Sequence, residues 1–425
     1  MKKNLINSKF LRNSTTLVVG TFISQLLTFL FLPFIAKLYS PDQIGLHASL
    51  LSISLVLSIF FTLQYHHAIL IPKNDRNVDG LARLSIYISI IFLFISIPIF
   101  FLMKENLDEI SFIKKLDGII LWAPFFAFLL ALNQIFINWF SKKRRFQIIS
   151  SNNILISFFN NTVGVLLGTM SFGVLGLVIA NLLANTFSSI KYLIHFLITN
   201  KSTNSFNEIK NLSKKYSKFP KITLYHSLFS SLSSELPILI IISYFNPSIT
   251  GLYFLASRLT KVPFTLINSS LYNVFFEEFS RVENKYKYFR KRFIQLFAIS
   301  FPLFIISMLI VPFLVNIFLD SRYSEISSMV LFLLPLFYLK LLSIFNVSGL
   351  FFFQKNVFLF QVEVFLFFLN ILALYVSIVF ENFYLFLLLN LIFFLFVVLL
   401  RFKIFIKLLK KSNHAYKNKN KSTLK

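Results

Sequence analysis

The stretch FYLFLLLNLIFFLFVVLL, residues 383–400, runs for eighteen residues without a charged side chain, and Arg401 follows it directly. A helix needs about 20 predominantly apolar residues to cross the hydrocarbon core of a bilayer, so this stretch predicts a membrane-spanning helix over residues 383–408. The whole chain has the same character, since 56% of its 425 residues are hydrophobic and only 14% are charged. Soluble domains carry about a quarter charged residues, so the composition argues against a soluble enzyme.

Similar apolar runs, separated by charged clusters, predict twelve spanning helices and therefore an all-α integral membrane protein. The spans expected in the first half are 13–36, 44–67, 81–103, 117–140, 147–169 and 172–197. Those expected in the second half are 222–244, 249–273, 293–317, 325–350, 357–379 and 383–408. The predicted organisation is an N-terminal six-helix half (1–198), a cytoplasmic linker (199–221), a C-terminal six-helix half (222–410) and a basic cytoplasmic tail (411–425).

The net charge of +26 is explained by membrane topology. Of the 42 Lys and Arg residues, 33 fall in segments on the side of the N-terminus, 5 fall on the opposite side and 4 fall within spans. Positively charged loops stay in the cytoplasm, so we expect both termini there, in a multi-pass protein of the bacterial cell membrane surrounded by membrane lipids. Because the basic residues are divided among seven cytoplasmic segments, they argue against nucleic-acid binding.

One short motif occurs in both halves. Tyr39-Ser40-Pro41-Asp42-Gln43-Ile44-Gly45-Leu46 follows the first span, and Phe245-Asn246-Pro247-Ser248-Ile249-Thr250-Gly251-Leu252 follows the seventh. An offset of six spans gives the two halves a parallel topology, related by an axis along the membrane normal, as in some secondary transporters. Such proteins hold their substrate in a central cavity between the halves and expose it alternately to the two sides.

Few ionisable residues are expected inside the spans, and such residues are candidate functional groups because charge is costly at membrane depth. Arg258 and Lys261 lie on one face of the eighth span, and Glu235 lies at a similar depth in the seventh. We expect Glu235 and Arg258 to interact near the midplane, either as an anion or coupling-ion site in a water-accessible cavity or as a structural ion pair. Lys340 in the tenth span is a further candidate cation, with an inward-facing structural lysine as the alternative.

Five uncharged polar residues in the spans are expected mainly to form hydrogen bonds between helices: Gln25, Asn160, Asn161, Asn181 and Asn185. A minority of these five could contact sugar hydroxyls. Gln25 is included among the cavity candidates. His66 and His67 end the second predicted span, where an interfacial role is favoured over proton transfer.

Signals of conventional enzymes are absent from the sequence. It contains no P-loop, no H-E-x-x-H and no G-x-S-x-G motif, and with no cysteine it offers no disulfide, iron–sulfur cluster or Cys-based zinc site. No catalytic residue, metal or cofactor is therefore predicted, and transport would use an ion gradient, the membrane potential or a substrate gradient.

Several segments resemble the polysaccharide-export family of O-antigen flippases, within the multidrug/oligosaccharidyl-lipid/polysaccharide flippase superfamily. They are Gly20 through Gln25, Leu32-Pro33, Lys37 through Gly45, His67 through Lys73, Ser234-Glu235-Leu236-Pro237, Gly251-Leu252-Tyr253, Arg258-Leu259 and Pro263. The resemblance implies a flippase that moves an oligosaccharide on a polyprenyl diphosphate from the cytoplasmic to the outer leaflet by alternating access. Other polysaccharide-assembly membrane proteins are then expected partners.

The resemblance also implies roles for single residues. Arg258 falls at the family's basic position in the eighth span, and Lys261 would be an addition in this chain. The peptidoglycan-precursor branch carries extra spans and several arginines in its first two helices. In this chain the first two predicted spans contain no arginine beyond Arg12 at the edge. An O-antigen (lipopolysaccharide), capsule or other surface glycan unit is therefore the expected cargo.

Two other functions fit the sequence less well. A multidrug and toxin extrusion antiporter would be expected to place carboxylates in its cavity for cationic drugs, whereas the deep groups here are mostly cationic. A membrane polysaccharide polymerase or ligase, an enzyme, usually carries a sizeable outer loop, and no predicted outer connection exceeds about a dozen residues. The sequence leaves open which glycan is moved, the coupling ion and the oligomeric state.

Overall fold

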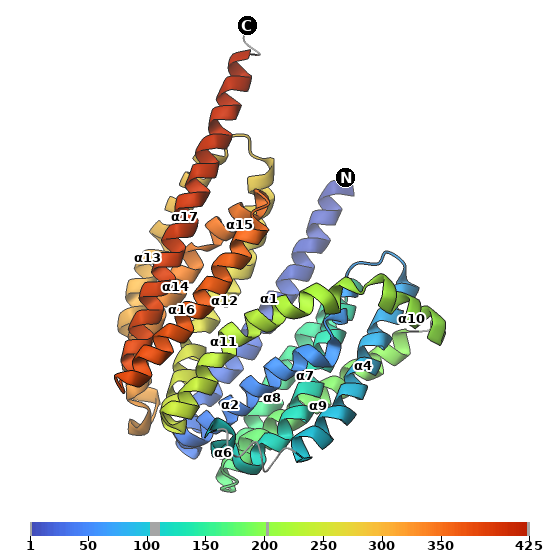
Figure 1. Cartoon of the computed structure of the whole chain (residues 1–425), viewed down its shortest axis with the longest axis vertical. Coiled ribbons are helices and arrows are strands. Elements are labelled where there is room, and N and C mark those ends of the chain that lie inside the picture. The colour runs from blue at the N-terminus through green and yellow to red at the C-terminus, as the bar shows by residue number, and fades with distance from the viewer. Residues whose placement is uncertain (1, 103–110, 201–203, 423–425) are drawn as a thin grey trace. The chain divides into compact units, whose positions relative to one another are not determined.

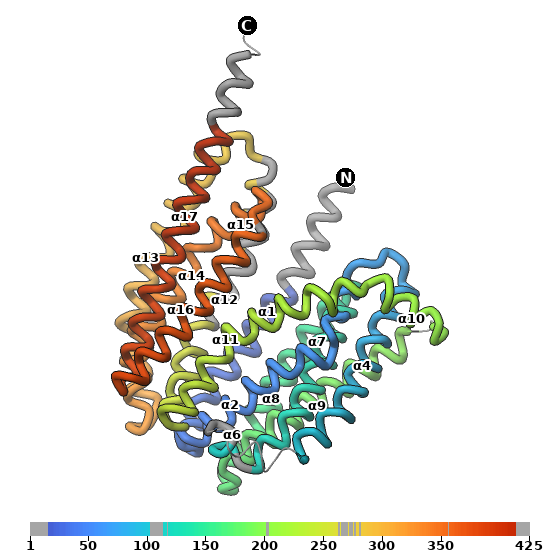
Figure 2. The backbone as a smooth tube through the Cα atoms, viewed as in Figure 1, coloured from blue at the N-terminus to red at the C-terminus, as the bar shows by residue number. Residues whose placement is uncertain are grey.

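The computed structural model describes residues 2–102, 111–200 and 204–422 (Figures 1 and 2). All regular elements in these ranges are helices, which confirms the predicted all-α class. The chain divides into two compact units, Met1–Gly251 and Leu252–Lys425. The side chains of Arg12 and Pro263, both named above, are not among the described ones.

Ten helical segments in the described part of the chain are long and apolar enough to cross a bilayer, so the protein is a multi-pass membrane protein. Helices α8 (Phe146–Thr169) and α12 (Pro247–Arg281) occupy the fifth and eighth predicted spans but are not among these ten. Asn152, Asn153, Asn160 and Asn161 lower the hydropathy of α8, and α12 is described only in part. The number of twelve spans and the two six-helix halves stay predictions.

The first unit runs from the N-terminus to Gly251, in the first turn of α12. Besides α8 its elements are α1 (Lys2–Leu38), α2 (Pro41–Thr62), α3 (Tyr65–Ala68), α4 (Asp75–Leu102), α6 (Ser111–Leu116), the 3-10 helix η1 (Asp117–Trp122), α7 (Ala123–Lys142), α9 (Val174–Thr199), α10 (Phe206–Lys215), the π-helical turn η2 (Phe219–Thr223) and α11 (Leu224–Tyr244).

The second unit contains the rest of α12 and the helices that follow it. These are α13 (Lys285–Phe318), the 3-10 helix η3 (Ser321–Tyr323), α14 (Glu325–Leu342), α15 (Ile344–Phe352), α16 (Asn356–Val379) and α17 (Phe383–Ser422).

The second predicted span, 44–67, ends earlier than expected. Leu63 and Gln64 have φ angles of 43° and 63°, in the left-handed region that interrupts an α-helix. Helix α2 therefore stops at Thr62, and the histidine pair belongs to the short helix α3. An apolar run does not reveal such a break, because the composition continues across it.

The predicted linker contains a helix of its own. Ser205 and Glu208 form a capping box that starts α10, in which each side chain satisfies a backbone N–H at the helix end. Ile209 and Leu212 are buried in the cluster formed with α4, and Arg76 of α4 pairs with Glu208 at 2.6 Å. This part of the predicted linker is thus attached to the first unit.

The repeated motif gives α2 and α12 the same type of start. Ser40 accepts a hydrogen bond from the Gln43 backbone N–H at 3.3 Å, and Asn246 accepts one from Ile249 at 2.7 Å. Pro41 and Pro247 begin the two helices, where a missing N–H costs nothing. The recurrence seen in the sequence is therefore a recurrence of helix caps.

The two motifs also contact each other within the first unit. A Cβ atom added to Gly45 would overlap the backbone oxygen of Pro247 and lie 2.9 Å from the Gly251 nitrogen. A Cβ atom on Gly251 would overlap the Pro41 oxygen and lie 2.9 Å from the Gly45 nitrogen. The starts of α2 and α12 thus cross backbone to backbone, with each glycine opposite the proline of the other motif.

An amide and hydroxyl network joins α7, α8 and α9 in the first unit. Asn133 donates to Asn185 Oδ1 at 3.2 Å, Ser188 donates to Asn133 Oδ1 at 2.6 Å, and Asn152 donates to Ser188 Oγ at 2.5 Å. All four residues are at least nine-tenths buried. The predicted role of membrane asparagines as hydrogen-bonding groups between helices is confirmed for Asn185.

Asn133 is central in this network, so we expect Asn133→Ala to lower the free energy of unfolding in detergent by about 1–2 kcal/mol. The loss arises because Ser188 and Asn185, both buried, each lose a hydrogen-bond partner. Thermal or denaturant unfolding of the purified protein measures it. Asn153→Ala, at a half-buried position of α8, is the matched control, and an equal effect of both variants would contradict a special role of the network.

Candidate functional site

A groove of about 720 Å³, lined mainly by residues with polar side chains, lies in the first unit, within the size range of small-molecule sites. Its walls come from α2, the turn and short helix α3 that follow, α7, and one face of α11 with the end of η2. Most of the polar groups that line it are hydroxyls, amides and imidazoles.

Helix α11 contributes a stripe of serines. Ser227, Ser230, Ser231 and Ser234 follow the spacing i, i+3, i+4 and i+7, which places them on one helix face, and all four line the groove. Two of them also donate to polar side chains of the groove, Ser227 to Gln64 at 2.9 Å and Ser234 to Glu235 at 3.2 Å, so this helix face suits a groove that takes a polar ligand. This stripe was not among the predicted site residues, although its spacing is visible in the sequence.

Glu235 follows the serine stripe and lines the same groove. Ser52 of α2 donates a hydrogen bond to Glu235 Oε2 at 2.8 Å, and Ser234 donates to Oε1 at 3.2 Å. Ser52 is almost completely buried, so the carboxylate is held against α2 by a fixed donor. Glu235 is the one acidic residue among the described groove residues, and no Lys or Arg occurs among them.

The far end of the groove is formed by the turn after α2. Gln64 is buried there and accepts a hydrogen bond from Ser227 at 2.9 Å. His66 Nδ1 lies 2.8 Å from Thr62 Oγ1, its backbone oxygen accepts a hydrogen bond from Asn138 at 3.1 Å, and its ring lies 4.1 Å from that of His67. These contacts fix the orientation of the histidine pair at the groove wall.

Burial lowers the pKa of His66 from 6.5 to about 3, with a further lowering from the neighbouring His67. The folded pKa lies below the unfolded value, so stability is complete above about pH 6.5 and is lost as the pH falls toward 3. We expect the unfolding free energy to drop by about 2 kcal/mol between pH 6.5 and 5 from this group. His66→Gln should reduce this acid sensitivity in thermal unfolding series. His195→Gln is the control, and an unchanged pH slope in His66→Gln would contradict the assignment.

The predicted cations belong to the second unit. Arg258 and Lys261 lie one turn apart on α12, and Lys340 lies on α14. The Lys340 ammonium is 4.8 Å from the ring centre of Phe337 and 5.5 Å from that of Phe394. The structure thus places the three predicted cations in one unit, with aromatic faces beside Lys340.

The remaining predicted residues are distributed differently. Gln25 is half-buried on α1 and does not line the groove, so its contact with substrate stays a prediction. An interaction between Glu235 and Arg258 would connect the two units and also stays a prediction. Among the described residues no group of three or more His, Asp and Glu side chains has an arrangement that could hold a metal ion.

The sequence model of the polysaccharide biosynthesis protein family matches residues 34–328, more than half of the chain. The chain belongs to this family. No curated protein matches it. Membership agrees with the resemblance to polysaccharide-export proteins noted in the sequence, and the O-antigen subfamily stays a prediction.

Solved structures with a similar fold are transporters of the multidrug/oligosaccharidyl-lipid/polysaccharide (MOP) superfamily. The lipid II flippase MurJ, in an inward closed conformation, has a TM-score of 0.72 at 13% identity, covering 94% of this chain and 90% of its own. A mutant form of the Vibrio cholerae MATE transporter VcmN has a TM-score of 0.63 at 14% identity, and the match covers 95% of this chain and 97% of VcmN. A MOP superfamily transporter from Pyrococcus furiosus has a TM-score of 0.58 at 14% identity, and the match covers 94% of this chain and 96% of the transporter. At these identities the likeness concerns the fold, which is that of the superfamily.

Proposed function

We propose that the protein is a flippase that carries an oligosaccharide on a polyprenyl diphosphate across the bacterial inner membrane by alternating access. The observation that carries this proposal is the groove of the first unit, whose hydroxyls, amides and imidazoles match the hydrogen-bonding groups of a sugar. Membership of a polysaccharide biosynthesis family and the fold shared with a lipid II flippase support it.

The division of charge in the chain fits the parts of such a substrate. The groove offers no Lys or Arg among its described residues, so a diphosphate would find no counter-charge there. Arg258, Lys261 and Lys340 provide cationic groups for the diphosphate, as proposed from the sequence. The polyprenol tail would remain in lipid, which avoids the cost of moving its apolar surface into a polar groove.

The cargo we propose is a surface glycan unit, such as an O-antigen or capsule repeat, built in the cytoplasm and presented outside. The distribution of basic residues favours a cytoplasmic location for both termini. The protein performs no covalent chemistry in this proposal, and other membrane proteins of polysaccharide assembly would supply and receive the substrate.

Deletion of the gene in its own host tests the proposal. We expect lipid-linked glycan to accumulate on the cytoplasmic face and surface polysaccharide to disappear, with rescue by the wild-type gene. Rescue should fail for Ser227→Leu combined with Ser231→Leu, which fills the groove, and should persist for Glu381→Gln, an exposed residue outside it. Unchanged surface polysaccharide and no accumulation in the deletion strain would contradict the proposal.

A drug antiporter is the second candidate, favoured by one observation. Glu235 is a carboxylate in a groove without Lys or Arg among the described lining residues, which suits a cationic drug, and MATE transporters share the fold. Increased sensitivity of the deletion strain to cationic drugs, with surface polysaccharide intact, would favour this candidate over the flippase.

A further inference from the structure

The groove of the first unit has an electrostatic character of its own. Its one formal charge among the described lining residues is the negative charge of Glu235. The lowered pKa values of His66 and His67 keep both imidazoles neutral near pH 7, so they supply no positive charge against which an acidic ligand could be bound. Whatever occupies the groove therefore meets hydroxyls, amides, the neutral imidazoles of His66 and His67, the side chain of His226 and one carboxylate.

Glu235 remains able to accept further hydrogen bonds. Ser52 and Ser234 each donate to a different carboxylate oxygen, and an ionised carboxylate has about four acceptor positions. A sugar hydroxyl or acetamido N–H can donate to the positions that remain. A second carboxylate can only accept, so it would bring like charge against like charge in a partly buried site.

From this arrangement we infer that the glycan carried in the groove is uncharged, built from neutral or acetamido sugars and free of uronic or other acidic residues. The inference rests on the proposed flippase function and names the class of glycan at the same site. Serine hydroxyls of α11 can both donate and accept hydrogen bonds, so they can bind sugar hydroxyls of different stereochemistry. The carboxylate of Glu235, in contrast, repels an acidic sugar. Like-charge contacts of this kind act mainly on specificity, by rejecting wrong partners.

Two synthetic probes of equal size test the inference. Both are trisaccharides on farnesyl diphosphate, one built from neutral and N-acetylated hexoses and one ending in a hexuronic acid. Binding is measured on the full-length protein in lipid nanodiscs at pH 7.5. We expect the wild type to bind the neutral probe about tenfold more tightly or better, since one such contact is worth about that factor.

Variants assign the selectivity to Glu235. Glu235→Gln should reduce the preference to about twofold or less, through tighter binding of the acidic probe. Ser230→Lys, which adds a cation at an exposed groove position, should favour the acidic probe and serves as an independent test if Glu235→Gln does not fold. Glu381→Gln removes an exposed carboxylate outside the groove and should leave the wild-type ratio unchanged.

The outcomes separate the two proposals. Equal or tighter binding of the acidic probe by the wild type, or an unchanged ratio in both Glu235→Gln and Ser230→Lys, would overturn the neutral-glycan inference and leave the flippase function standing. If neither probe binds, the flippase proposal itself is overturned, and the inference with it.

Discussion

Replacing Gly45 by alanine is expected to force apart the starts of α2 and α12 and to lower the free energy of unfolding by about 1–3 kcal/mol. The added methyl group would overlap the backbone oxygen of Pro247, and a backbone atom cannot move aside as a flexible side chain can. Thermal unfolding of the purified protein in detergent measures the effect. Gly118→Ala is the matched control, because a Cβ atom there has no heavy atom within 4 Å.

The repeated motif makes this prediction stricter. Gly251→Ala would place its methyl group against Pro41 in the same way, so its effect should be similar in size. The chain contains no cysteine, so one introduced at Thr250, which is fully buried beside the crossing, reports on its opening through maleimide labelling. Labelling should increase in the Gly45→Ala background. If Gly45→Ala behaves like Gly118→Ala in both measurements, the close crossing does not exist.

The crossing shows where sequence reasoning ends. The caps formed by Ser40 and Asn246 were visible as a recurrence, because a cap depends on residues adjacent along the chain. The contact between Gly45 and Gly251 depends on which helix faces meet, and a spacing of 206 residues does not encode that. The repeat in the sequence includes both glycines, and the structure explains why glycine is needed there: a side chain would collide with the backbone of the other motif.

The candidate site was predicted in part for a related reason. Ionisable residues such as Glu235 and Lys340 are conspicuous in an apolar span, and the structure gives each a defined environment. Serines are less informative, because a serine in a helix satisfies its hydroxyl on its own backbone, as Ser243 does with Leu239 at 2.7 Å. The serine stripe of α11 therefore gained its meaning only when α2 and α7 were seen to form the opposite walls.

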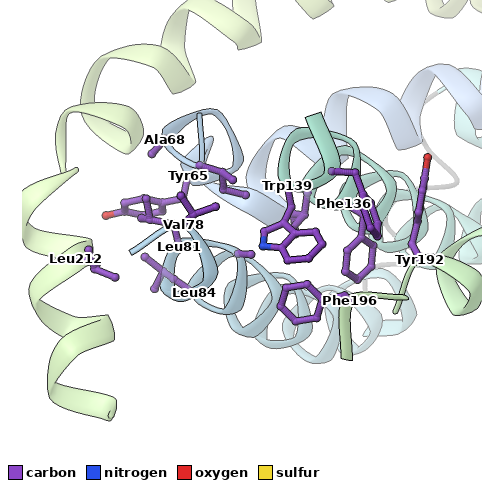
Figure 3. Packing of buried hydrophobic residues seen from close by; sticks show 14 of the residues in the cluster. Tyr65, Ala68, Val78, Leu81, Leu84, Phe136, Trp139, Tyr192, Phe196 and Leu212 are labelled. Carbon is purple, nitrogen blue, oxygen red and sulfur yellow. The ribbon is translucent and has the colours of Figure 1, made fainter. Parts of the chain in front are cut away.

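Trp139→Ala should be the most destabilising single change considered for the first unit, costing about 3–5 kcal/mol of unfolding free energy. Trp139 is completely buried in the cluster of Figure 3, with its ring centre 4.9 Å from those of Phe140 and Phe196 in edge-to-face contacts. Its indole N–H donates to Asp79 Oδ1 at 2.8 Å. Alanine would remove both the packing and this hydrogen bond.

Trp139→Phe separates the two contributions, because it keeps an aromatic ring and removes the N–H. We expect it to cost about 1–3 kcal/mol, since Asp79 is buried and would lose a donor, although Lys143 remains 3.5 Å from the same oxygen. Trp122, which is 40% exposed, provides the control Trp122→Ala with a smaller effect. Denaturant unfolding followed by circular dichroism compares all three variants. A Trp139→Phe protein as stable as the wild type would show that the partners left to Asp79, Lys143 among them, satisfy it, and that the tryptophan is required at this position for its volume.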